Sequence, residues 1–85
     1  MMFDIKYSRQ AVKYLKSLDK KLVLRIIHKI EKLKDEPISH DSKTVEGNNE
    51  KMFRVRVGAY RILYEVDFKN DLIGIIKIEK RGKAF

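Results

Sequence analysis

The sequence contains no cysteine and no tryptophan, and it has a single proline. Without cysteine the chain has no disulfide framework, no thiolate metal site and no thiol nucleophile. The two histidines, His28 and His40, match no metal-ligand spacing, so the sequence predicts neither a metal site nor a cofactor. No apolar run approaches the roughly 18 residues that cross a membrane, and no signal peptide opens the chain. We therefore expect a cytoplasmic protein without membrane contact.

Positive charge is in excess. The 85 residues include 20 Lys and Arg against 12 Asp and Glu, which gives a formal net charge of +8. A folded domain this small and basic most often meets nucleic acid or an acidic partner, and the alternative is a soluble protein that is merely basic. The excess is concentrated late in the chain, because residues 51–64 hold four basic and no acidic side chains and residues 77–85 hold four and one.

Two helices are expected after a short N-terminal strand. Apolar and polar residues alternate from Phe3 to Tyr7, which is typical of a half-buried strand. Apolar residues then recur at helical spacing in two segments, the first capped by Ser8 and the second by Asp19. Pro37 marks the end of the second helix, because proline disfavours helix at the residue before it. The short connection predicts that the helices form an antiparallel hairpin.

Three strands are expected after a surface loop at residues 38–50, which has no hydrophobic period. They cover residues 52–57, 60–66 and 72–80, and the last is apolar on both faces, which is typical of an interior strand. The sequence thus predicts an α+β fold with two layers and one domain, residues 1–85. Its elements are an N-terminal strand, an antiparallel α-helical hairpin and a three-stranded antiparallel meander, in the order β-α-α-β-β-β.

The turn between the first two of these three strands predicts a basic site. A two-residue turn at Gly58-Ala59 pairs Val57 with Tyr60 and Arg56 with Arg61. Arg54 then shares a face with both arginines, opposite the apolar side chains that meet the helices. Like charges directly opposite one another destabilise a strand pair, so this arrangement favours an anion between them. The alternative is a solvated face whose arginines pair with Glu65 or Glu79.

The end of the last strand adds more cations. It carries Lys77, Lys80, Arg81 and Lys83. If this strand lies beside residues 60–66, Arg81 joins the arginine cluster at its rim. Phe85 is expected either to stack on a base or to close the hydrophobic core.

The stretch from Val45 to Phe85 resembles the RelE/ParE toxins of bacterial and archaeal toxin–antitoxin pairs, and in particular the RelE branch of type II mRNA interferases. The resemblance rests on Val45-Glu46-Gly47, on the string FRVRVGAYRILYEV at residues 53–66, and on Lys80-Arg81. It implies a RelE-like microbial RNase fold and a ribosome-dependent, metal-independent endoribonuclease. Such an enzyme cuts mRNA in the decoding site by attack of a ribose 2′-OH on the adjacent phosphate.

The resemblance also implies roles for individual residues. It makes Arg54, Arg56, Arg61 and Arg81 the catalytic set, in which Arg61 stabilises the phosphate and Arg81 either binds the phosphate or acts as the acid. It makes Lys80, Lys83 and Phe85 substrate-binding residues. Many members have lysine where this chain has Arg54 and Arg56, and tyrosine where it has Phe85. Since arginine hardly loses its proton, the general base is Lys80, Lys83, Glu79 or a ribosomal group, and we expect slow, electrostatic and orienting catalysis.

The implied partners are a neutralising RelB-like antitoxin, the ribosome at its A site, and mRNA. The apolar edge of the helical hairpin and the basic sheet face are the expected antitoxin contacts. Operator DNA is expected only through the antitoxin complex. Two other functions stay open: a ParE-like inhibitor of DNA gyrase, and a non-catalytic module that binds RNA or the ribosome.

Overall fold

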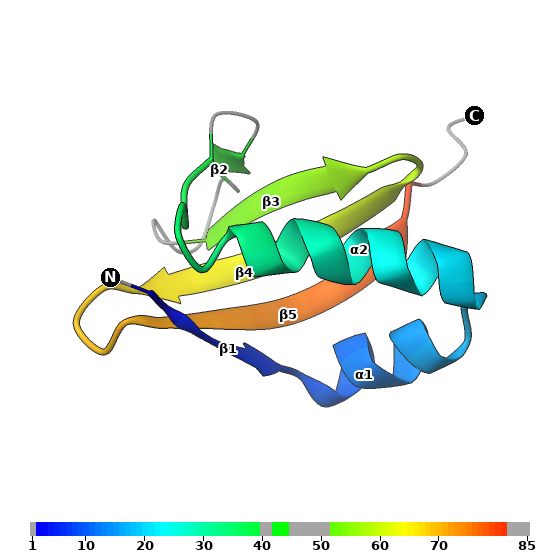
Figure 1. The fold of residues 1–85 in the computed structure, drawn as a ribbon, viewed down its shortest axis with the longest axis horizontal. Helices are drawn as coiled ribbons and strands as arrows, with labels where there is room; N and C mark the ends of the chain where they lie inside the picture. The colour runs from blue at the N-terminus through cyan, green and yellow to red at the C-terminus, as the bar shows by residue number, and fades with distance from the viewer. Residues whose placement is uncertain (1, 40–41, 45–51, 82–85) are drawn as a thin grey trace.

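The computed structural model describes residues 2–39, 42–44 and 52–81, which form two helices and one five-stranded sheet (Figure 1). The elements, in chain order, are β1 (Asp4–Tyr7), α1 (Arg9–Lys16), α2 (Lys20–Lys32), β2 (Lys43–Thr44), β3 (Met52–Val57), β4 (Tyr60–Asp67) and β5 (Leu72–Lys80). The predicted α+β class is confirmed, and so is the predicted order of the main elements. Neither helix is long and apolar enough to span a bilayer.

The helices begin at the predicted caps. The Ser8 hydroxyl accepts a hydrogen bond from the backbone N–H of Ala11 at 3.0 Å, and the Asp19 carboxylate accepts one from Leu22 at 2.9 Å. Each cap satisfies a donor that the first helical turn leaves unpaired, and is worth about 1 kcal/mol. After its cap, α1 packs chiefly against β5, and α2 packs against β3.

The sheet has the strand order β1-β5-β4-β3-β2. β3, β4 and β5 form the predicted antiparallel meander, while β1 pairs in parallel with β5. β5 is therefore an interior strand, as its apolar sequence predicts. The prediction of a loop throughout 38–50 is wrong at Lys43–Thr44, which pair with β3 as the short edge strand β2. A strand of two residues is too short to show a period of two, so the sequence alone does not reveal it.

A β-bulge interrupts the pairing of β4 with β5. Leu63 lies opposite Lys77 and Tyr64 opposite Ile75, which leaves Ile76 as the extra residue. The extra residue restarts the alternation of side chains, so Ile75 and Ile78 are both buried although they are three residues apart. Lys77 is thereby directed to the face away from the core, and Ile76 is partly exposed.

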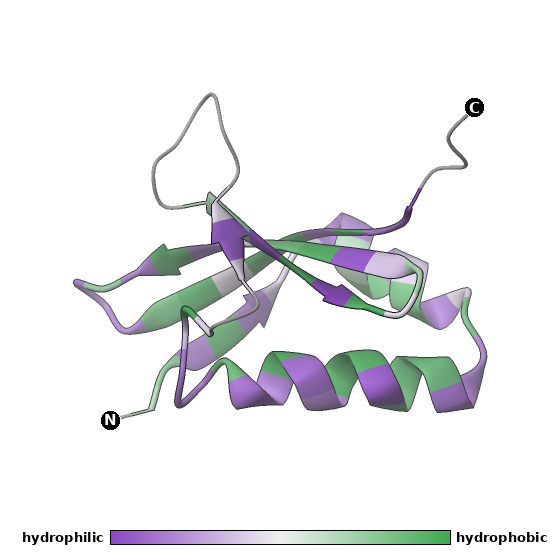
Figure 2. Cartoon of the chain, turned by 90° about the horizontal axis from the view of Figure 1, so that it is seen from above, coloured by the Kyte–Doolittle hydropathy of each residue, from purple (hydrophilic) through white to green (hydrophobic). Residues whose placement is uncertain are grey.

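The core lies between the helices and one face of the sheet. Its largest buried side chains come from α2, β4 and β5, and they include Ile26, Ile30, Ile62, Tyr64, Ile73 and Ile78. Figure 2 shows α2 beneath the sheet and α1 beside it, with the opposite face of the sheet turned away from α2. That opposite face carries the arginines discussed below.

Candidate functional site: a basic face on the open side of the sheet

The β3–β4 hairpin has the predicted register, with Val57 opposite Tyr60 and Arg56 opposite Arg61. Gly58 opens the turn with φ at 58°, a left-handed conformation that glycine adopts without strain. Because residues directly opposite one another point to the same side, Arg54, Arg56 and Arg61 share the open side of the sheet. Successive arginines on β3 are about 6.7 Å apart along the strand.

Two lysines extend this arrangement on either side of the hairpin. Lys43 of β2 lies directly opposite Arg54, and Lys77 of β5 lies opposite Leu63. Together they form what we call the basic face: Lys43, Arg54, Arg56, Arg61 and Lys77. Sequence reasoning missed Lys43, because it belongs to the segment predicted as a loop and only the pairing of β2 brings it to Arg54.

The outer edge of the basic face is hollowed. A pocket of about 280 Å³ is lined by Lys43, Arg54, Val55 and Arg56. Arg56 is exposed and Arg54 is half-buried, so both guanidinium groups can reach an anion from solution. Within the described part of the chain, neither arginine forms an ion pair. A guanidinium group holds a phosphate through two parallel hydrogen bonds, so the lining of this pocket suits an anion such as phosphate.

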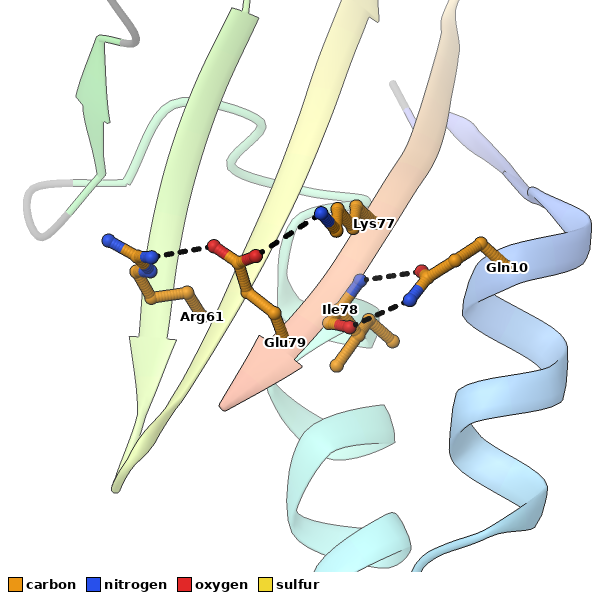
Figure 3. A network of polar contacts seen from close by, with 5 residues as sticks. All are labelled: Gln10, Arg61, Lys77, Ile78 and Glu79. Carbon is orange, nitrogen blue, oxygen red and sulfur yellow. Dashed lines mark hydrogen bonds and ion pairs between the residues drawn. The ribbon is translucent and has the colours of Figure 1, made fainter. Parts of the chain in front are cut away.

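Arg61 differs from its neighbours because a carboxylate already holds it (Figure 3). Its Nη2 lies 2.6 Å from Oε2 of Glu79, and Oε1 of the same carboxylate lies 3.4 Å from Nζ of Lys77. The expected alternative, an arginine paired with Glu79, therefore applies to Arg61. The Nε of Arg61 is buried and has no hydrogen-bond partner among the described residues.

Arg81 lies at the hairpin end of the basic face. Its backbone N–H donates a hydrogen bond to the carbonyl of Ala59 at 2.7 Å, which ties the end of β5 to the β3–β4 turn. Lys80, in contrast, lies opposite Tyr60, whose ring is 6.4 Å from that of Tyr14 on α1. The structure therefore places Lys80 on the helix side of the sheet and not on the basic face. Lys83 and Phe85 lie outside the described residues.

The end of β5 is held in place by a side chain of α1. β1 ends at Tyr7, and beyond that point the side chain of Gln10 lies against the edge of β5 (Figure 3). The amide of Gln10 donates to the carbonyl of Ile78 at 3.2 Å and accepts from the N–H of Ile78 at 3.1 Å. One side chain thus replaces a strand neighbour, and it positions the residue beside Glu79.

Two titratable groups with shifted pKa values lie elsewhere in the molecule. Burial raises the pKa of Tyr7, and the charge of Glu31 raises it further. A hydrogen bond to the side chain of Glu31, together with the charge of that carboxylate, raises the pKa of Lys34. None of these residues belongs to the basic face, so these shifts do not bear on its chemistry.

A second surface feature lies between the two helices. An apolar groove of about 520 Å³ separates α1 from α2, at the place where the sequence predicts an apolar edge. Its lining is mostly aliphatic and includes Val12, Leu15, Leu18, Val23 and Ile27, with Lys16 and Lys20 among the lining residues. Val12 is 39 % exposed, so the groove is open to solvent.

The chain is similar to proteins of a known family. The family model for the ParE toxin of the type II toxin–antitoxin system parDE matches residues 5–85. The chain belongs to this ParE toxin family. The predicted membership of the RelE/ParE superfamily is thereby confirmed, and the protein is a toxin of a type II toxin–antitoxin system.

Relatives of this ParE-family chain carry RelE names. A protein of Methanocaldococcus jannaschii named RelE1 is 33 % identical over 88 residues, which cover 100 % of this chain and 97 % of the relative. The RelE chain in a RelE–RelB complex from Pyrococcus horikoshii is 34 % identical and superimposes with a TM-score of 0.87, covering 99 % of this chain and 100 % of that one.

The fold extends to more distant relatives of this toxin. The isolated RelE toxin of Escherichia coli superimposes with a TM-score of 0.83 at 14 % identity, covering 96 % of this chain and 87 % of that one. At this level of identity the similarity concerns the fold alone. The overall fold is thus shared at low sequence identity.

Proposed function

We propose that this toxin is a ribosome-dependent endoribonuclease that cleaves mRNA in the decoding site. The observation that carries the proposal is the basic face, on which Arg54, Arg56 and Arg61 share one side of the sheet. Arg81 lies at its hairpin end. These arginines add little to stability, since Arg56 lies directly opposite another arginine and neither Arg54 nor Arg56 forms an ion pair among the described residues. They suit a ligand that brings several phosphates.

The proposed reaction is attack of a ribose 2′-OH on the adjacent phosphorus. The 2′-oxygen loses its proton to a general base and forms a new P–O bond, and the P–O5′ bond breaks. The products are a 2′,3′-cyclic phosphate and a 5′-OH, whose oxygen takes a proton from a general acid. Arg54, Arg56, Arg61 and Arg81 would stabilise the additional negative charge on the pentacoordinate phosphate.

The basic face does not by itself identify the residue that acts as general base. The guanidinium group of arginine hardly gives up its proton, so Arg54 and Arg56 act by charge and orientation only. Glu79 is a carboxylate beside the basic face, but Arg61 and Lys77 hold it as an ion pair. Lys83 and a ribosomal group are the other candidates, since Lys80 lies on the helix side of the sheet, and Phe85 is proposed to stack on a base. We expect slow catalysis that depends on the ribosome for proton transfer.

The proposal includes a RelB-like antitoxin. The solved RelE of Pyrococcus horikoshii is in complex with RelB, and a RelB–RelE complex is also known from Methanococcus jannaschii. On this chain the apolar groove between α1 and α2 and the basic face are the surfaces that such a partner would cover. The site of action is then the cytoplasm, where the ribosome and mRNA are, and operator DNA is bound through the antitoxin complex.

A ParE-like inhibitor of DNA gyrase is the second candidate, because the family model itself is named for ParE. The two functions leave different products in the cell. Primer extension on a translated message, with and without ribosomes, separates them. Cuts within codons that require ribosomes support the endoribonuclease. Intact message with accumulating DNA breaks supports the gyrase inhibitor, and growth arrest without either supports a non-catalytic module that binds RNA or the ribosome.

A further inference from the structure

We propose that Glu79 is a resident counter-ion of the phosphate site, which occupies Arg61 in the free toxin and weakens RNA binding until a phosphate displaces it. Glu79 is thus a positioning residue that acts through Arg61. The inference rests on the proposed function, since it takes RNA phosphate as the ligand of the basic face.

The first argument is the placement of the carboxylate. Glu79 lies directly opposite Arg61 in the β4–β5 pairing, and its two oxygens contact Arg61 at 2.6 Å and Lys77 at 3.4 Å (Figure 3). One carboxylate therefore contacts two of the five cations of the basic face, and its single negative charge offsets one of their two positive charges. The bulge at Ile76 makes this possible, because it directs both Lys77 and Glu79 to the open side.

The second argument is that the Arg61–Glu79 pair is incomplete. Nη2 of Arg61 donates a hydrogen bond to the carboxylate, and the buried Nε has no hydrogen-bond partner among the described residues. A guanidinium group binds most strongly when two adjacent N–H groups meet two oxygens. Glu79 leaves part of that capacity unused, whereas a phosphate has enough oxygens to use it after a small rotation of the arginine.

The third argument is that the pair is open to exchange. The side chains of Arg61 and Glu79 are 30 % and 28 % exposed, so an incoming anion can reach both. Ion pairs that solvent can reach contribute little to stability, so exchange of this partly exposed pair costs the fold little. Once a phosphate takes Arg61, the carboxylate faces both the phosphate and Lys77, and its repulsion of the phosphate lowers affinity.

The test uses a probe that binds but cannot be cleaved. A short 2′-O-methyl oligoribonucleotide keeps the phosphates and lacks the nucleophile, and its binding to the free toxin is followed by fluorescence anisotropy. Glu79→Gln removes the charge at nearly constant shape. The matched control is Glu65→Gln, which makes the same charge change on the same side of the sheet, four residues along β4 from Arg61, opposite Gly74 and Met52.

We expect Glu79→Gln to tighten binding roughly three- to ten-fold and to steepen the dependence of log affinity on log salt by about one unit, as one more cation becomes available. Glu65→Gln should tighten binding by less than half as much. In an Arg61→Ala background, Glu79→Gln should lose most of its effect, because the carboxylate acts through that arginine. A merely structural role of Glu79 would produce neither the salt effect nor this dependence.

Three results would overturn the inference. Equal tightening by both glutamine variants would show that the change in affinity comes from the net charge of the protein and not from the contact with Arg61. Weaker binding by Glu79→Gln would make Glu79 a group that orients Arg61 for the substrate. Unchanged affinity in both variants would show that Glu79 does not weaken RNA binding in the free toxin. Failure of the proposed function is distinct, because it would appear as an oligonucleotide that binds while no ribosome-bound message is ever cut.

Discussion

Arg56 of β3 lies directly opposite Arg61 of β4, but the two side chains differ in their ion pairing. Arg61 is paired with Glu79 on the neighbouring strand, whereas Arg56 is exposed and forms no ion pair within the described residues. One member of the pair is therefore available to an incoming phosphate, and the other must first exchange its partner. This asymmetry is the basis of the predictions on activity.

The double variant Arg61→Ala/Arg81→Ala is expected to abolish toxicity while the protein stays folded. Loss of a group that stabilises the transition state typically costs 10²- to 10³-fold in rate. The measurement is growth after induction, together with mapping of mRNA ends. Arg9→Ala is the control, because Arg9 is an exposed arginine of α1 outside the basic face. Equal growth arrest by the double variant would show that the site is elsewhere.

Val12→Asp is expected to weaken neutralisation by a RelB-like antitoxin without unfolding the toxin. Val12 lines the apolar groove and is 39 % exposed, so a carboxylate there stays hydrated in the free protein and would be buried in the complex. We expect a loss of affinity of tenfold or more, about 1.4 kcal/mol, measured by titration calorimetry. Leu24→Asp is the control, since Leu24 is 62 % exposed on α2 and does not line the groove. An antitoxin that binds both variants equally well would place the interface elsewhere.

Tyr64→Phe is expected to lower the free energy of unfolding by about 1–2 kcal/mol. The hydroxyl of this fully buried tyrosine donates to the carbonyl of Pro37 at 2.8 Å and lies 2.7 Å from the Ser42 hydroxyl. Its loss leaves a carbonyl of the segment after α2 without that donor. Urea unfolding measures the change. Tyr60→Phe, at a half-buried position, should be close to neutral, and an equal loss there would remove the stated cause.

Gln10→Leu is expected to loosen the end of β5. The variant removes both hydrogen bonds to the backbone of Ile78, so the amide of Ile78 should exchange with deuterium faster by tenfold or more, as expected from about 1–2 kcal/mol of local stability. Lys13→Leu, one turn further along α1, is the control. Unchanged exchange at Ile78 would show that the strand is held without Gln10.

The sequence was sufficient to predict features whose causes are local. Ser8 and Asp19 cap the helices because their side chains can reach an N–H three residues on. The two-residue turn at Gly58 determines the whole register of β3 with β4, and with it the common side of the three arginines. Even so, the strand β2 and the basic residue Lys43 were missed, because two residues carry no period.

Other features of the site depend on residues far apart in the chain. The pairing of Arg61 with Glu79 was one of two open alternatives, and only the β4–β5 register decided it for that arginine. The bulge at Ile76 and the position of Lys80 beside Tyr60 also follow from this pairing. No pattern within β5 predicts a bulge, since it arises from fitting one strand against its neighbours.

The chain by itself thus determined the element order, the caps, the hairpin register and the clustering of arginines on one strand face, because these depend on backbone preferences and alternation within a few residues. The tertiary structure alone decided which cation is already neutralised, which lysine joins the basic face and which is turned away from it. Those outcomes depend on how strands separated in sequence are aligned, and a shift of one residue in that alignment moves a side chain to the other face.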